Sequence, residues 1–350
     1  MIPSVTIEVL RARRPLVALL GPTAVGKSRI GILVANSLET EVLTADSRQV
    51  FRGMDIGMDK PSEAERRGVP HRLIDLVAPN EPFNAGMYRR LAMQEIERVY
   101  AAGRIPLVVG GTGLYVRTLI RGLWSGPAAD WSMRTRFMDQ EREQGPGFLH
   151  RELRRVDPES AARLHPRDLV KIVRALEVSA LSHRPLSDVH REHGFKDRPF
   201  TALLIGLNRD RAALYGRIDE RVESQVSKGL IEETQRLLSE GHGRQLGSMK
   251  GLGYRQIAGY LVGEYDYAEA IRRLKRDTRH FAKRQLTWFR KEPDLRWLMI
   301  DERESPEDTA ERVVAVIQEF LDGLSTSEAP VCARLSTTAF LQGAGTHAGG

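Results

Sequence analysis

The sequence contains a single cysteine, Cys332, near its C-terminal end. One cysteine cannot form an intrachain disulfide, and it cannot supply a zinc site built from cysteines. Long apolar runs are also lacking: no stretch approaches the length needed to span a membrane, and the opening "MIPSVTIEVLRARRP" has no signal-peptide core. We therefore expect a cytoplasmic protein that makes no membrane contact.

Acidic residues are outnumbered by basic ones: the chain has 46 Asp and Glu and 53 Lys and Arg, which gives a formal net charge of +7. A basic surplus suits a polyanionic partner, but it is also common in proteins that bind no nucleic acid. The rest of the composition is ordinary, with 41% hydrophobic residues in a chain of 350. That length accommodates a core domain with an insertion, and we expect a monomer.

Short apolar runs that end in glycine or polar turns predict the strands of a parallel sheet. Helical patterns such as "KSRIGILVANSL" and "MYRRLAMQEIERVYAAGR" alternate with them, which predicts helices on both faces of the sheet. In such folds ligands bind beyond the carboxyl ends of the strands. The five runs are "RPLVALLG", "TEVLTADS", "IPLVVGGTG", "FTALLIGLNRD" and "LRWLMIDE".

The strand signal disappears between residues 123 and 198, where "DWSMRTRFMDQEREQ" and "DLVKIVRALEVSALSH" have amphipathic helix patterns. We therefore predict a helical insertion domain at 123–198 within a catalytic core formed by 14–122 and 199–322. Residues 1–13 form an N-terminal extension in this interpretation. The end of the chain, 323–350, is rich in Ser, Thr, Ala and Gly and is expected to be disordered.

The stretch "GPTAVGKS" satisfies the pattern G-x-x-x-x-G-K-[ST] with Gly21, Gly26, Lys27 and Ser28. The glycines allow backbone N–H groups to surround phosphate oxygens, and the following helix adds the positive end of its dipole. Lys27 supplies charge, and the Ser28 hydroxyl is placed to ligate Mg²⁺. Because the motif stands between a strand and a helix, it predicts a P-loop NTPase-like fold and a phosphate ligand whose identity stays open.

Two further stretches carry chemistry. Asp46 ends the second predicted strand, where it can serve as metal ligand, as general base, or merely as a helix cap. In "YGRIDERVESQV", Ile218, Val222 and Val226 form a buried stripe, and Arg217 and Arg221 emerge together on its flank. Arginine is the favoured side chain for forked contacts to phosphate, although surface arginines are usually solvated or paired with acids.

The segment 270–291, "AIRRLKRDTRHFAKRQLTWFRK", combines an apolar side with a stripe of basic residues on one helix. Such a ridge suits a phosphate backbone, whereas a solvated face or a membrane-surface helix are the competing interpretations. The basic stripe comprises Arg272, Arg276, Arg279, Lys283 and Arg290, and the apolar side comprises Ile271, Leu274, Phe281, Trp288 and Phe289.

With these stretches assembled, the chain closely resembles the tRNA dimethylallyltransferases, also called tRNA isopentenyltransferases. The likeness extends over about residues 15 to 300, and the motifs stand in family order. The zinc finger at the end of eukaryotic members is missing, which indicates the bacterial type. The matching stretches are "GPTAVGKS", "ADSRQVFRGMDIG", "HRLID", "LVVGGTGLYV", "HPRDLVKIVRALEV", "YGRIDERV", "GLIEE", "KGLGYRQI" and "TRHFAKRQLTWFRK".

This resemblance implies that the P-loop holds the diphosphate of dimethylallyl diphosphate, and that the prenyl group passes to the N6 amine of the adenine 3′ of a tRNA anticodon. It implies Asp46 as the general base, with Arg217 and Thr23 at the diphosphate. Mg²⁺ near Ser28 would help to stabilise the leaving group. The diphosphate would contact the whole loop: Gly21, Pro22, Thr23, Ala24, Val25, Gly26, Lys27 and Ser28.

The resemblance also implies tRNA contacts, with the target base flipped into a channel and the insertion domain binding the anticodon stem-loop. These contacts include the last part of the basic helix. The residues implied are Asp46, Ser47, Arg48, Gln49, Thr112, Arg134, Val170, Lys171, Ile172, Val173, Arg174, Lys250, Gly251, Leu252, Gly253, Tyr254, Arg255, Lys283, Arg284, Gln285, Leu286, Thr287, Trp288, Phe289 and Arg290.

Some positions depart from the family pattern. "GMDKP" stands where Gly-Thr-Ala-Lys-Pro is usual, so Met58 and Asp59 are new, and Val170-Lys171 replaces a common Gln-Arg pair. "KGLGY" replaces a frequent Gln-Ala-Leu-Gly-Tyr. Three rival functions remain at the level of sequence: a small-molecule P-loop kinase that binds ATP, a prenyltransferase acting on AMP, and a non-catalytic RNA-binding protein with a relic P-loop.

Overall fold

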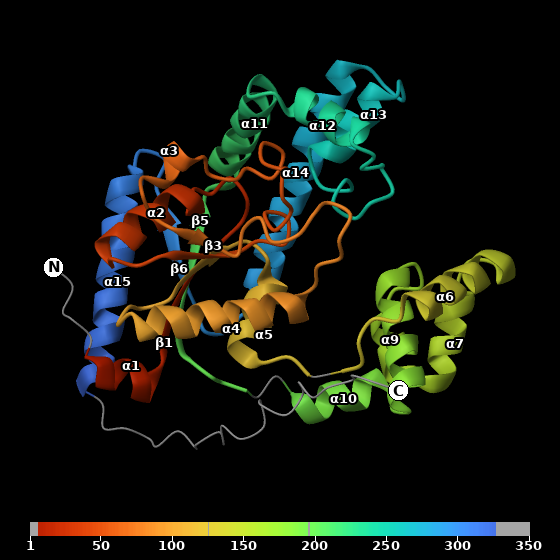
Figure 1. The fold of residues 1–350 in the computed structure, drawn as a ribbon, viewed down its shortest axis with the longest axis horizontal. Coiled ribbons are helices and arrows are strands. Elements are labelled where there is room, and N and C mark those ends of the chain that lie inside the picture. Colours follow the sequence, from red (N-terminus) through yellow and green to blue (C-terminus); the bar gives the residue numbers. More distant parts are fainter. Residues whose placement is uncertain (1–5, 125, 195–196, 327–350) are drawn as a thin grey trace, which may run out of the picture.

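The computed structural model describes residues 6–124, 126–194 and 197–326 (Figure 1). Its centre is one sheet of six parallel strands in the order β3-β2-β4-β1-β5-β6. All five predicted strands are present, and the short β3 is an addition that the apolar runs did not indicate. The strands are β1 (Pro15–Leu20), β2 (Val42–Ala45), β3 (His71–Arg72), β4 (Leu107–Gly110), β5 (Thr201–Arg209) and β6 (Leu295–Ile300).

Helices cover both faces of the sheet, as the buried strand patterns require. One face packs against a cluster that includes α1, α2 and α15, and the other packs against α4 and α5. All six residues of β1 are buried because side chains on both of its sides meet these helices. The bounds are α1 (Ile7–Arg13), α2 (Lys27–Ser37), α3 (Glu63–Arg66), α4 (Ala85–Ala101), α5 (Gly113–Arg121) and α15 (Pro306–Thr326).

A second group of helices extends the core beyond the carboxyl ends of the strands. They share a hydrophobic cluster with the loop 50–58, which includes Met54 and Met58. Tyr254 is the largest of its fully buried members. These helices are α11 (Arg211–Ser227), α12 (Leu230–Ser239), α13 (Tyr254–Leu261) and α14 (Tyr267–Phe289).

The predicted insertion consists of helices joined by loops in its described part, and it stands to one side of the sheet in Figure 1. Its helices bury a hydrophobic cluster of their own, which includes Leu149, Leu153 and Ile172. The helices are α6 (Trp131–Gln144), α7 (Phe148–Val156), α8 (Pro158–Arg163), α9 (Leu169–Ser182) and α10 (Leu186–His193).

Two boundaries differ from the sequence interpretation. The N-terminal extension contains α1, whose Leu10 is buried against the core, and α15 continues beyond residue 322 to Thr326. The helix α15 continues because apolar residues recur at helical spacing and are buried, namely Val313, Ile317 and Leu321. The rest of the expected disordered tail, 327–350, lies outside the described residues. Within the described ranges, no helix is both long and apolar enough to traverse a bilayer.

Candidate active site

The P-loop connects β1 to α2 and has the backbone conformation that its glycines permit. Gly21 has φ +151, and a Cβ at that position would lie 2.5 Å from the carbonyl oxygen of Leu207, so a larger residue cannot fit. Gly26 caps α2 with φ 112, and Ala24 also has positive φ. The first N–H groups of α2 therefore open toward the cavity described below, as an anion site requires.

Lys27 begins α2, and its Nζ donates to the carbonyl oxygen of Pro22 at 2.7 Å. Burial lowers the pKa of Lys27 to about 8, Asp46 partly opposes that shift, and Arg221 adds to it. The ammonium is thus poorly solvated and lacks a carboxylate in direct contact among the described residues. An incoming anion would stabilise its charge.

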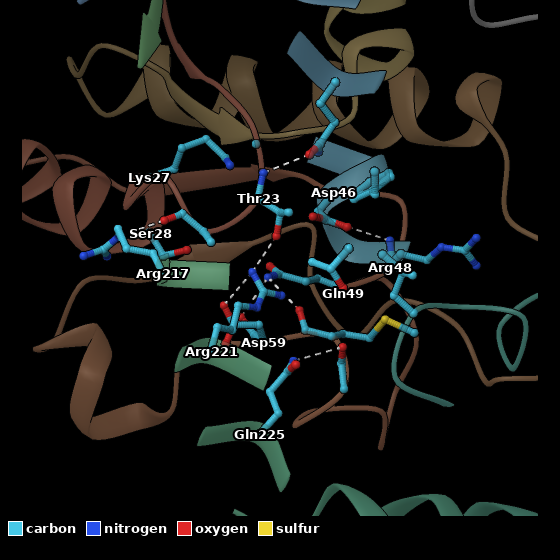
Figure 2. Close-up of a pocket in the computed structure, with 18 of the residues that line it drawn as sticks. Thr23, Lys27, Ser28, Asp46, Arg48, Gln49, Asp59, Arg217, Arg221 and Gln225 are labelled. Atoms are coloured by element: carbon cyan, nitrogen blue, oxygen red, sulfur yellow. Dashed lines mark hydrogen bonds and ion pairs between the residues drawn. The ribbon is translucent and has the colours of Figure 1, made fainter. Parts of the chain in front are cut away.

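Both arginines of α11 reach the P-loop, but through different atoms (Figure 2). The Arg217 Nε donates to the carbonyl oxygen of Ala24 at 3.0 Å. The Arg221 Nη1 donates to Thr23 Oγ1 at 2.6 Å and lies 3.2 Å from Asp59 Oδ2. The shared flank predicted from sequence is therefore real, and Arg221 makes the closer side-chain contact with Thr23.

Asp46 follows β2 directly, and its Oδ1 accepts from the backbone N–H of Arg48 at 2.8 Å. Next to it, the N–H of Ser47 donates to Thr112 Oγ1 at 2.9 Å, because β2 and β4 are neighbours and end at the same level. Arg48 donates through Nη1 to the carbonyl oxygen of Gly247 at 2.8 Å, and partial burial lowers the pKa of its guanidinium. The carboxylate of Asp46 remains half-buried at the cavity wall.

One cavity of about 720 Å³ collects these groups at the carboxyl end of the sheet. Its wall includes most of the P-loop side chains, Asp46, and both arginines of α11. Many of the residues implied for tRNA also line it, so the two predicted binding regions meet in one place. Those residues are Arg48, Gln49, Lys250, Leu252, Arg255, Arg284 and Gln285.

Gln285 of α14 connects two of the site's loops. Its Oε1 accepts from the N–H of Thr23 at 2.8 Å, and its Nε2 donates to the carbonyl oxygen of Gly111 at 3.0 Å. Sequence resemblance placed Gln285 at the tRNA, whereas the structure shows a side chain that fixes the P-loop against the loop after β4. This bridge depends on where α14 packs, which no local pattern encodes.

Other residues implied for tRNA do not line the cavity. Arg134 and Arg174 both bind the carboxylate of Glu177, which is fully buried, and Lys171 pairs with Asp168. Val170 is 83% exposed on the same insertion domain. Several side chains are buried and can support a contact surface without forming it: Ile172, Val173, Tyr254 and Phe289.

The basic stripe of α14 is less charged than its spacing predicts. Arg272 pairs with Glu269, Arg276 with Asp277, and Arg279 with Asp219 of α11. Glu269 immediately precedes the predicted segment and Asp219 lies on another helix, so neither acid is part of the run. Lys283 and Arg290 are exposed, and neither has an ion pair with any residue of the described ranges.

Comparison with known proteins agrees with this arrangement. The family model described as IPP transferase matches residues 49–292. A tRNA dimethylallyltransferase of Pelotomaculum thermopropionicum is 46% identical over 290 residues, which cover 83% of this chain and 92% of that protein.

Solved structures give the same family. The full-length tRNA isopentenylpyrophosphate transferase of Bacillus halodurans has a TM-score of 0.67 at 36% identity, covering 89% of this chain and 98% of that one. A eukaryotic dimethylallyltransferase, described as acting on tRNA, has a TM-score of 0.77 at 25% identity, covering 88% and 80%. The chain therefore belongs to the IPP transferase family, that of the tRNA dimethylallyltransferases, and is a transferase with a P-loop NTPase-like fold.

Proposed function

We propose that this protein transfers a dimethylallyl group from dimethylallyl diphosphate to the N6 amine of adenine at position 37 of tRNA, releasing diphosphate. The observation that carries this proposal is that a carboxylate, Asp46, lines the same cavity as the P-loop and the two arginines of α11. The family relationship and the solved relatives support the same chemistry. We further propose that the enzyme acts as a monomer in the cytoplasm.

The donor would bind with its diphosphate in the P-loop. Allylic C–O cleavage leaves positive charge on carbon and negative charge on the departing diphosphate. The N–H groups at the start of α2, Lys27, Arg217 and Arg221 are positioned to stabilise that negative charge, and Thr23 orients Arg221 by accepting its hydrogen bond. The P-loop is therefore used here for a leaving group and not for a transferred phosphoryl group.

A Mg²⁺ ion would fit beside this diphosphate. Within the described ranges no three His, Cys, Asp or Glu side chains gather to bind a metal, so protein ligands are few. Mg²⁺ in P-loop sites is held largely by substrate phosphates and water, with the hydroxyl of the residue after the P-loop lysine, here Ser28, as protein ligand. When bound, it would neutralise part of the diphosphate charge.

Asp46 would accept the proton from the adenine amine. The hydrogen bond from the Arg48 N–H orients one carboxylate oxygen and leaves the other available. Adenine must leave its stack to reach this position, and a cavity of about 720 Å³ is large enough for an extruded base and a prenyl diphosphate. We propose that the insertion domain, 123–198, contacts the anticodon stem-loop while exposed cations of α14, such as Lys283 and Arg290, contact the RNA backbone.

The direct test uses labelled dimethylallyl diphosphate and unmodified tRNA. Label should enter RNA at adenine 37, and a transcript with guanine at that position should stay unlabelled. Asp46→Asn retains an acceptor for the Arg48 N–H, so it should keep tRNA affinity while turnover falls about a hundredfold or more.

Each rival makes a different prediction in the same assay. A small-molecule kinase would leave the RNA unlabelled and transfer phosphate from ATP, and an AMP prenyltransferase would label AMP instead. A relic RNA-binding protein would label nothing, and Asp46→Asn would change only its affinity for RNA.

A further inference from the structure

Asp59 is a carboxylate in the cavity wall, on the side where the P-loop and the arginines of α11 are suited to an anion. Its Oδ2 lies 3.2 Å from the Nη1 of Arg221, the same atom that donates to Thr23 Oγ1 at 2.6 Å. Figure 2 shows Asp59, Arg221 and Thr23 pointing toward one another below the P-loop. A negative side chain at this place opposes the binding of a diphosphate and so calls for a physical explanation.

The position of Asp59 is fixed by the loop that carries it. Its backbone has φ 52, its N–H donates to the carbonyl oxygen of Ile56 at 3.1 Å, and its own carbonyl oxygen accepts from Gln49 Nε2 at 3.1 Å. Just upstream, the buried carboxylate of Glu233 accepts from three consecutive N–H groups, those of residues 55, 56 and 57, at 2.9 to 3.0 Å. The loop thus presents the Asp59 side chain to the cavity in a defined orientation.

Asp59 lies among the charged side chains around the P-loop. Lys27, Arg217 and Arg221 supply three cations, and Asp46 is already assigned to the acceptor amine. Asp59 is left with Arg221 as its ion-pair partner, and the pair is half-exposed, with side chains 45% and 24% accessible. A diphosphate oxygen that approaches Arg221 must displace this carboxylate or lie beside a like charge.

We propose that Asp59 competes with the diphosphate group for Arg221 and thereby lowers the affinity of the site for diphosphate, a role that rests on the function proposed above. When the site is empty, the carboxylate keeps Arg221 oriented next to Thr23. After transfer, it takes Arg221 back and favours departure of the product.

The test measures the Kd of inorganic pyrophosphate by calorimetry in Mg²⁺-containing buffer. Asp59→Asn removes the charge but retains the shape and the tolerance of asparagine for positive φ. Affinity should rise by about twofold to fivefold, the scale of a half-exposed ion pair. A merely structural role for Asp59 would weaken binding or leave it unchanged, and either result overturns the proposal.

Arg221→Gln supplies the second arm. On its own it should weaken pyrophosphate binding, and in that background Asp59→Asn should no longer tighten it. Tightening of equal size in both backgrounds would show that Asp59 does not act through Arg221. A loss of affinity on Asp59→Asn that appears only with Mg²⁺ would make Asp59 a metal ligand and also contradict the proposal. Failure of the unaltered protein to bind pyrophosphate would instead count against the proposed function itself.

Discussion

Lys27 carries a charge that the folded protein stabilises poorly. Its ammonium is poorly hydrated, which lowers its pKa to about 8, yet a diphosphate needs the protonated form. Above pH 8 the free protein carries mostly neutral Lys27, so anion binding must be accompanied by proton uptake. The same shift affects the free energy of unfolding, because the pKa of Lys27 is lower in the folded protein than in the unfolded chain. Charged Lys27 therefore destabilises the fold below about pH 8, and this destabilisation is lost as pH rises from about 8 to 10.5.

We therefore expect the affinity for pyrophosphate to fall as pH increases through about 8. Calorimetry in two buffers of different ionisation enthalpy would show proton uptake on the protein at pH 8 to 9. Lys27→Met is the control, because pyrophosphate still titrates in its presence while the titrating ammonium of Lys27 is removed. This variant should bind weakly at every pH and should have a raised Tm at pH 7, with the gain shrinking toward pH 10. An unaltered pH profile in Lys27→Met would assign the titration to another group.

Single residues also mark the limit of prediction from sequence. The P-loop, Asp46 and the arginine pair of α11 were predicted from motif and spacing, and the structure brings them to one cavity. Asp59 and the bridging role of Gln285 were not predicted, because each depends on contact with an element distant in sequence. Both roles arise from tertiary placement and not from local pattern.

Among the elements, α14 has two faces of different character. Its buried face carries Leu274, Thr278, Ala282 and Gln285 toward the core and the site. On its exposed face the first arginines pair with acids, whereas Lys283 and Arg290 near the C-terminal end have no ion-pair partner in the described part of the chain. The spacing predicted the amphipathic helix correctly, but not the ion pairs, since Asp219 comes from α11.

Gln285→Leu tests the buried face of α14. The substitution leaves the Thr23 N–H and the Gly111 carbonyl without their partner, which should lower the free energy of unfolding by about 1 to 3 kcal/mol. The KM for the prenyl donor should also rise, because Thr23 lies in the P-loop. Thr287→Ala on the exposed face is the matched control, expected within about 0.5 kcal/mol of the parent in urea unfolding. Equal effects of the two substitutions would remove Gln285 from its bridging role.

At the scale of the whole molecule, the chain divides into two bodies, the core and the helical insertion, each with its own hydrophobic cluster. The loss of strand signal after residue 123 predicted the helical insertion, and the structure shows that this insertion has a separate hydrophobic cluster. The sequence could not show how far the two bodies pack against each other, because an apolar helix face does not specify the element against which it packs. Residues that follow the strands and residues of α11 line the cavity, and Arg134 and Val170 of the insertion are not among the residues that line it.

This division predicts that diphosphate binding and tRNA binding can be separated by matched core substitutions. Leu149 of α7 and Leu214 of α11 are both buried, with 0% and 2% accessibility, but belong to different clusters. Each Leu→Ala change should cost about 2 to 5 kcal/mol locally. Leu149→Ala should then weaken tRNA binding while pyrophosphate affinity stays within about twofold, since the P-loop has its own support. Leu214→Ala, next to Arg217 on the same helix, should weaken pyrophosphate binding as well. Calorimetry measures the affinity of both variants for pyrophosphate, and filter binding measures their affinity for tRNA. A parallel loss of both affinities in Leu149→Ala would mean that the insertion and the core unfold as one unit.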